Sequence, residues 1–313
     1  MSAIRIMFGA AIVVAAASLI AHGSTGAAQP EKKQASSAAR VSTLAPGQPF
    51  DWNPDEHTGP VRLRAGDMDL LVERMRDADG LTGPRVTLSS PGRTPAVLEG
   101  DRAGLTFPSR ITVGKWDRSG ALFVLLESYT GGAHCCTHVQ AAVPTAGGFE
   151  IADLDAYDGE RLARLPEDID GDGAVDFLVS DDAFLYAFSS YAGSFPPPRV
   201  LHVVGGKAVD VSSRPGFKPL FAEAMEKARP RCEQGEPGYC AGYAASAARA
   251  GLLDEAWPQV LRFTKGKVRL ADLPTGCRVD PKDGECPEAE TVRYASYEEA
   301  LKAFLVEHGY LEG

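Results

Sequence analysis

Basic residues are in the minority in this 313-residue sequence, and no stretch of it is strongly basic. Its 32 Lys and Arg stand against 42 Asp and Glu, which gives a formal net charge of −10. Because phosphate binding needs clustered Lys and Arg, this balance excludes nucleic acid as the expected partner. Two catalytic signatures are also missing, the Gly-x-Ser-x-Gly turn and the His-Glu-x-x-His zinc motif. The sequence therefore specifies no reaction, and we lean towards a protein that is not an enzyme.

Long hydrophobic runs are missing except at the N-terminus, where Arg5 precedes the apolar run Ile6 to Ala21. A membrane-spanning helix needs roughly 20 apolar residues, so this shorter run favours a removed export signal over an anchor. We predict a signal peptide over residues 1–28, cut after Gly23 or Ala28. Since no Cys lies near the cut, a lipid anchor has no attachment site. We expect a periplasmic or extracellular protein with no stable membrane insertion after cleavage.

Three further segments differ in composition. Residues 29–49 are rich in Lys, Ser, Ala, Gln and Pro and are typical of a flexible linker. Residues 50–213 sustain no helical period and alternate turn residues with short apolar segments, which predicts a mainly β domain, an antiparallel sandwich or a small propeller-like arrangement. The strands that we expect include Ile111–Val113, Ala121–Tyr129, Val139–Val143, Phe177–Val179 and Val200–Val204. Leu122–Leu126 is apolar at every position, which predicts burial on both faces of the sheet.

Residues 214–313 predict a small α-helical domain. Apolar residues from Phe217 to Ala228 fall at helical spacing, and Pro230 is expected just past that helix. Further helices are expected over about 239–250, ending at Gly251, and around Ala256 to Leu261. A last helix follows Ser296, which forms a capping box with Glu299.

The six cysteines lie in the exported part, where an even number indicates disulfides. Local spacing suggests that Cys232 pairs with Cys240 and Cys277 with Cys286. These two bridges would staple the helical region. Six cysteines allow 15 pairings, so the connectivity stays open at this point.

One acidic loop carries recognisable chemistry. Asp168-Ile-Asp-Gly-Asp-Gly-Ala-Val-Asp176 places carboxylates at loop positions 1, 3, 5 and 9, with Gly173 at position 6. Glycine there permits a sharp turn that brings the backbone carbonyl of position 7 inward. Hard divalent cations bind oxygen ligands of this kind, and closely spaced carboxylates repel each other without one. The predicted Ca²⁺ ligands are Asp168, Asp170, Asp172, the Ala174 carbonyl and Asp176. The alternative is a solvated acidic turn without metal.

An EF-hand is not expected, because position 12 is Val179 instead of Glu and a strand follows the loop. The Asp-x-Asp-Gly-Asp-Gly-x-x-Asp pattern before an apolar strand resembles the calcium loop of FG-GAP and VCBS repeats, the blades of integrin-like propellers. The resemblance covers about residues 165–184 and a single copy. It implies a loop that binds Ca²⁺ and braces a β-structure, in modules that are commonly extracellular adhesion or ligand-binding surfaces.

The segment Thr130-Gly-Gly-Ala-His-Cys-Cys-Thr-His138 concentrates two imidazoles and two thiols. His134, Cys135, Cys136 and His138 could bind a metal or support redox or nucleophilic chemistry. In an extended strand the two histidines would stand about 13 Å apart, too far for one ion. A disulfide between the adjacent cysteines is the structural alternative, and it would need a distorted or cis peptide. The string from Ser128 to Cys136 also resembles segments of uncharacterised exported bacterial proteins, which implies no activity.

Three functions remain open from the sequence. The first is an exported calcium-binding module that presents loops to a protein or glycan ligand. The second is a periplasmic hydrolase or metal or redox protein, in which His134 or His138 would act as a base with Asp181 or Asp182. The third is an inhibitor of an envelope enzyme. Removing the signal leaves 31 basic and 42 acidic residues, a net charge of −11, part of which is concentrated in the acidic loop.

Overall fold

The computed structural model describes residues 41–76, 82–101, 108–131, 135–158, 162, 164–280 and 285–312. The predicted signal peptide (1–28) and residues 29–40 of the expected linker lie outside these residues. Ala39–Gly313 forms one compact unit, within which we call residues 41–213 the β-region and residues 214–312 the helical region. None of the helices described is both long and apolar enough to cross a membrane.

Five strands of the β-region form the first sheet, in the order β1-β3-β4-β5-β6. They are β1 (Val41–Thr43), β3 (Val61–Ala65), β4 (Met68–Arg76), β5 (Thr82–Ser89) and β6 (Ala96–Glu99). All neighbours are antiparallel except β1 and β3. Alternate residues are buried along β3 and β4, as expected for a sheet with one face on the core.

Eight strands form the second sheet, in the order β11-β12-β13-β10-β9-β8-β7-β2. They are β2 (Pro49–Trp52), β7 (Ser109–Lys115), β8 (Leu122–Tyr129), β9 (Thr137–Pro144), β10 (Phe149–Tyr157), β11 (Phe177–Ser180), β12 (Pro198–Val204) and β13 (Lys207–Asp210). A short parallel pairing of β10 with β13 joins the last hairpin to the rest, and the other pairs are antiparallel.

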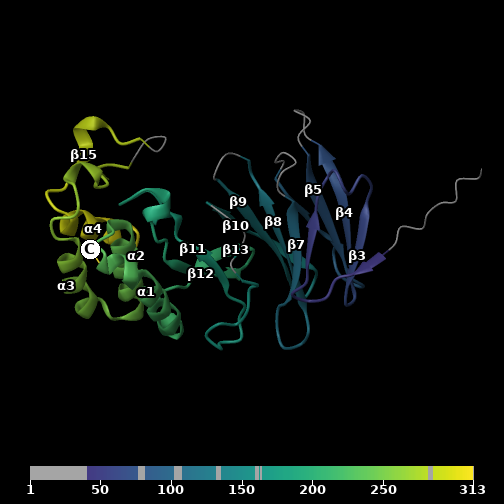
Figure 1. Ribbon diagram of the computed structural model, residues 1–313. Coiled ribbons are helices and arrows are strands. Elements are labelled where there is room, and N and C mark those ends of the chain that lie inside the picture. The colour runs from purple at the N-terminus through teal and green to yellow at the C-terminus, as the bar shows by residue number, and fades with distance from the viewer. Residues whose placement is uncertain are drawn as a thin grey trace, which may run out of the picture. The chain divides into compact units, whose positions relative to one another are not determined.

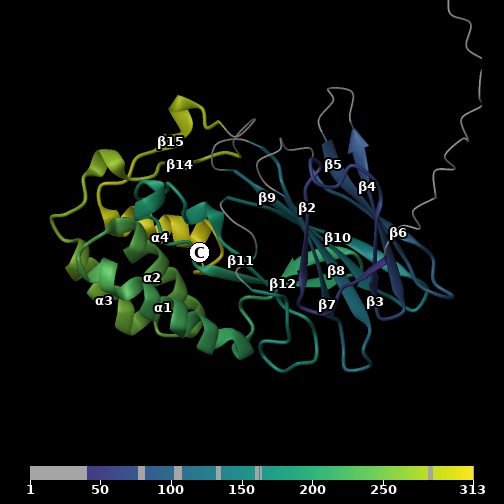
Figure 2. The ribbon, with the colours of Figure 1, turned by 45° about the vertical axis from the view of Figure 1, so that its right-hand side comes forward.

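The two faces of β8 belong to two different cores. Val124 and Leu126 pack with residues of the five-stranded sheet, which makes this part a sandwich. Phe123 and Leu125 face the other way and pack with β11 and β12, so the large sheet curls over its own outer face (Figure 2). The expected mainly β fold and the burial of this strand on both faces are confirmed.

The helical region contains α1 (Lys218–Glu233), α2 (Pro237–Ala250), α3 (Leu253–Thr264) and α4 (Tyr297–Glu307) (Figure 1). A short hairpin, β14 (Gly276–Cys277) with β15 (Thr291–Val292), precedes α4. Gly251 ends α2 in the left-handed conformation, with φ of 78°, and the Ser296 side chain accepts a hydrogen bond from the Glu299 backbone N–H at 3.1 Å. The disulfides Cys232–Cys240 and Cys277–Cys286 are both present. The predicted helical, disulfide-stapled region is therefore confirmed.

Two boundaries differ from those expected. The linker 29–49 includes β1 and the first residue of β2, because Val41–Thr43 pairs with β3. Helix α1 runs through Pro230 to Glu233, because Cys232 is fully buried and its bridge to Cys240 holds the last turn in the core.

Candidate metal centre

The acidic loop lies between two backbone hydrogen bonds that close its base. Glu167 and Asp176 form an antiparallel bridge directly before β11, with N···O distances of 3.3 and 2.9 Å. Gly171 and Gly173 have φ of 81° and 93°. Because residues other than glycine rarely adopt such φ angles, the two glycines permit the tight loop within this bridge.

Backbone N–H groups inside the loop orient its carboxylates. Asp168 accepts hydrogen bonds from the Gly171 N–H at 2.8 Å and the Gly173 N–H at 3.1 Å. Asp170 accepts one from the Asp172 N–H at 3.1 Å. These bonds hold the side chains near one another before any ligand is considered.

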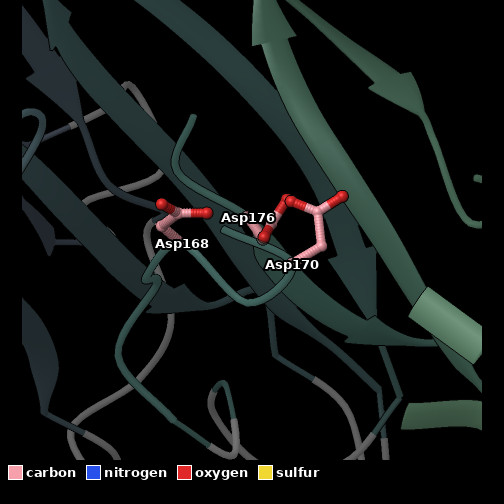
Figure 3. A group of neighbouring side chains, drawn as sticks. All are labelled: Asp168, Asp170 and Asp176. Atoms are coloured by element: carbon pink, nitrogen blue, oxygen red, sulfur yellow. The ribbon is translucent and has the colours of Figure 1, made fainter. Parts of the chain in front are cut away.

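Three carboxylates meet inside the loop. Asp168, Asp170 and Asp176 each offer an oxygen, and these oxygens lie within 4.8 Å of one another (Figure 3). Figure 3 shows Asp170 and Asp176 side by side, with the Asp168 carboxylate turned towards them. Oxygens alone make up this donor set, which suits a hard cation such as Ca²⁺ better than Zn²⁺ or Cu²⁺. The residues thus fit the predicted cation.

Asp176 is the buried member of the group, with no exposed surface. Its Oδ2 accepts a hydrogen bond from the Ile169 N–H at 2.6 Å, and its Oδ1 lies 2.5 Å from His202 Nε2 on β12. Burial raises the pKa of the Asp176 carboxyl, and the nearby charge of Asp170 adds to this rise. A bound cation would offset both effects, because it favours the charged form.

Asp172 and Ala174 are placed differently from the other predicted ligands. Asp172 Oδ2 forms an ion pair with Arg214 Nη1 at 2.9 Å, and its Oδ1 accepts the Ala174 N–H at 2.8 Å. Asp172 does not belong to the group of three carboxylates. The role of the Ala174 carbonyl stays a prediction.

The sequence did not indicate His202 or Arg214 as parts of this site. His202 is 26 residues from Asp176, and Arg214 is 42 residues from Asp172. A lone His in a strand and a lone Arg after one carry no local pattern that would link them to the loop.

The segment from Thr130 to His138 contains a disulfide between adjacent cysteines and a histidine whose two ring nitrogens each contact a carboxylate. Cys135 and Cys136 are bonded to each other across a cis peptide. His138 Nδ1 lies 2.6 Å from Asp101 Oδ2, and its Nε2 lies 3.0 Å from Asp153 Oδ1. The hydrogen bond to Asp101 raises the pKa of His138 to about 9, against the opposing effect of burial and with further help from Asp153. His134 lies outside the described residues.

Both ring nitrogens of His138 are engaged by carboxylates. A protonated imidazole held by two carboxylates is a poor metal ligand and a poor base near neutral pH. Asp181 accepts a hydrogen bond from the Tyr310 hydroxyl at 2.8 Å. The carboxylates bonded to His138 are therefore Asp101 and Asp153, and neither Asp181 nor Asp182 is among them. The hydrolase hypothesis with His134 as the base stays a prediction.

Comparisons with known proteins give matches over most of the chain. The family described as the sll0997 C-terminal domain matches residues 220–309, which include all of α2, α3 and α4. The probable thylakoid lumen protein sll0997 of Synechocystis is 33% identical over 276 residues, which cover 84% of this chain and 79% of that protein.

A second relative is the uncharacterised protein y4bJ of Sinorhizobium fredii, 31% identical over 264 residues. The match covers 80% of this chain but 40% of that longer protein. The comparison with solved structures gives no match. From the extent of the match to sll0997, the chain belongs to the family of this probable thylakoid lumen protein.

Proposed function

We propose that this chain is an exported calcium-binding protein in which one Ca²⁺ braces the β-region and fixes a surface for binding a ligand. The similarity to a probable thylakoid lumen protein supports an exported location, in line with the apolar N-terminal run. The observation that carries the calcium proposal is the convergence of Asp168, Asp170 and Asp176 within 4.8 Å.

The energetic reason for a cation lies in the repulsion between these carboxylates. Asp176 is fully buried, and among the described residues its carboxylate contacts the Ile169 N–H and His202 Nε2. Three carboxylates with oxygens this close repel one another strongly in a partly buried setting. Ca²⁺ with its remaining ligands from backbone carbonyls and water would convert that repulsion into attraction. The resemblance to the calcium loops of FG-GAP and VCBS repeats supports the same proposal.

A hollow beside the loop supports a binding role. It has a volume of about 380 Å³, and Trp116, Lys115 and Arg118 line it together with Asp168 and Gly173 of the loop. Trp116 offers an amphipathic ring, and the charged side chains of Lys115 and Arg118 offer hydrogen-bond donors. Because two loop residues form part of its wall, cation binding would fix the shape of this hollow. We propose it as the surface that takes up a protein or glycan ligand.

The calcium proposal is tested by calorimetric titration of metal-stripped protein with Ca²⁺, followed by thermal unfolding. We expect one site per chain. At a Ca²⁺ concentration of about 100 times Kd, the folded state gains about 2.7 kcal/mol, which raises Tm by about 5 °C or more. Equal melting curves in excess EGTA and in excess Ca²⁺ would contradict the proposal.

Matched variants locate the site within the loop. Asp170→Asn should abolish the Ca²⁺-dependent rise in Tm. Asp172→Asn should largely retain it, since Asp172 is bonded to Arg214. The control is Asp272→Asn, an exposed carboxylate of the helical region that is paired with Arg269. If Asp272→Asn weakens Ca²⁺ binding as much as Asp170→Asn does, the ion is bound by surface charge and the proposed site is wrong.

A further inference from the structure

A cavity of about 430 Å³ lies between the large sheet and α1, and no residue of the acidic loop 168–176 lines it. Strands β9 and β11 contribute to it on one side, α1 on another, and the segment 195–198 also lines it. Its apolar lining includes Val139, Leu178, Phe195, Pro196, Leu220 and Ala224. This volume falls in the range of about 300–1,000 Å³ that is typical of small-molecule sites.

One carboxylate, Asp158, lines this cavity, and a second, Asp182, is hydrogen-bonded to the Asp158 backbone. Asp158 directly follows β10, and its backbone N–H donates to Asp182 Oδ2. The Oδ1 atom of Asp158 and the Oδ1 atom of Asp182 are both buried, with no hydrogen-bond partner in the part of the chain that the structure describes. Buried polar atoms nearly always have a partner in folded proteins, so these two oxygens leave the negative charge of the pair without a direct hydrogen-bond partner.

The nearby positive charges are already engaged. Lys227, which also lines the cavity, forms an ion pair with Glu223 at 2.8 Å. Arg199 bonds to Asp210 at 3.1 Å, although its charge still acts on Asp182. Burial outweighs that attraction and raises the pKa of the Asp182 carboxyl, and the charge of Asp158 adds to the rise. The cavity therefore has negative charge at one end that the described side chains do not neutralise by direct contact.

We infer that this cavity binds a small organic cation, an amine with an aliphatic or aromatic body, whose ammonium group pairs with Asp158 and whose body packs against the apolar walls. A hard cation such as Ca²⁺ is a poorer occupant, because it needs six or more oxygen ligands and the walls are mostly hydrocarbon. An ammonium group supplies three N–H donors to carboxylate oxygens, and the walls supply burial for its body. The inference is independent of the calcium loop.

The experiment uses phenethylammonium as the probe and phenethyl alcohol as its uncharged counterpart. Binding of each to the mature protein is followed by two-dimensional amide NMR. We expect the amine to shift the signals of β9, β11 and α1 and the alcohol to bind about tenfold more weakly or worse, since a charge-assisted hydrogen bond is lost. Excess EGTA should leave amine binding unchanged, which separates this result from the calcium proposal.

Variants test the two parts of the cavity. Asp158→Asn should weaken amine binding about tenfold, and Ala224→Leu should block it by filling the wall, while Asp67→Asn in an exposed turn changes nothing. Far-UV circular dichroism verifies that each variant is folded. Equal affinity for amine and alcohol, or unchanged binding in Asp158→Asn, would overturn the inference. The absence of amine binding would overturn it too, and a higher Tm for Asp158→Asn would then identify the carboxylates as a repelling pair that shares a proton.

Discussion

The β-region and the helical region are stabilised by different chemistry. Among the described residues, every buried Asp, Glu and His belongs to the β-region: Glu127, Asp176, Asp181 and His202. The helical region instead buries alanines and aromatic rings and carries two disulfides that close loops, Cys232–Cys240 and Cys277–Cys286, whereas the Cys135–Cys136 bridge of the β-region joins adjacent residues. We expect the stability of the β-region to respond to cations and pH, and that of the helical region to respond to thiol reductants.

The largest expected effect is the loss of a fully buried leucine, which should lower the stability of both regions by a similar amount. Leu126→Ala in the sandwich and Leu301→Ala in α4 each remove a fully buried side chain. Each should lower the free energy of unfolding by about 3 kcal/mol, through lost burial and the cavity left behind. Urea unfolding followed by circular dichroism measures both. A cost below about 1 kcal/mol for one variant would mean that its core collapses around the gap and is more loosely packed than the other.

The next effect concerns the disulfides. The double variant Cys232→Ser, Cys240→Ser opens a short loop and leaves two polar groups in a core where both cysteines are fully buried. We expect a loss of about 2.5 kcal/mol or more in the free energy of unfolding.

The matched control for this variant is Cys277→Ser, Cys286→Ser. Its loop has nearly the same length, with a sequence separation of 9 against 8, but its sulfurs lie nearer the surface. The smaller loss that we expect isolates the contribution of burial. Equal losses would assign the whole effect to loop closure.

A smaller effect distinguishes the β-region from the helical region by the pH dependence of its stability. His138 has a folded-state pKa of about 9, above the ordinary value of 6.5. Its contribution is fully present below pH 6.5 and is lost as the pH rises through about 9. Since Asp153 is largely exposed, we expect a screened contribution of about 1–2 kcal/mol.

Unfolding in urea at several pH values measures this contribution, with His138→Gln as the control that cannot titrate. The wild type should lose more stability than the variant between pH 6.5 and 9.5. Parallel pH profiles would show that the two carboxylates do not hold the imidazolium. Disulfide variants of the helical region should leave the difference unchanged.

The smallest effect lies at the start of α4. Ser296→Ala removes the side-chain acceptor of the Glu299 N–H and should cost about 1 kcal/mol in the free energy of unfolding. Ser296→Asp restores an acceptor and should recover most of this loss. If Ser296→Asp loses as much stability as Ser296→Ala, the cap depends on packing instead of the hydrogen bond.

Local features of the fold could be predicted from the sequence because their partners are close along the chain. The apolar run of β8 and the cap of α4 are set by neighbouring residues. The two helical-region disulfides join cysteines with sequence separations of 8 and 9, so spacing indicated the right pairs. The parallel pairing of β10 with β13 and the curl of the large sheet depend on contacts between distant strands, for which one sequence carries no period.

The same distinction applies to the candidate sites. The convergence of Asp168 with Asp170 and Asp176 follows from a short loop, and its carboxylate spacing predicted it. His138 meets Asp101 across 37 residues, and only the folded sheet brings them together. The proximity of His138 to two cysteines in the sequence suggested metal or redox chemistry. In the structure the two cysteines bond to each other, and His138 contacts two carboxylates.

The contact of the acidic loop with Gly216 has a mechanical consequence. A Cβ at Gly216 would lie 2.6 Å from Asp170 Oδ2, so only a glycine fits at this point. Two residues earlier, Arg214 holds Asp172. The loop therefore rests directly on the joint where the β-region passes into the first helix. A side chain at position 216 would have to displace Asp170, so the segment that leads into α1 and the predicted cation site are sterically coupled.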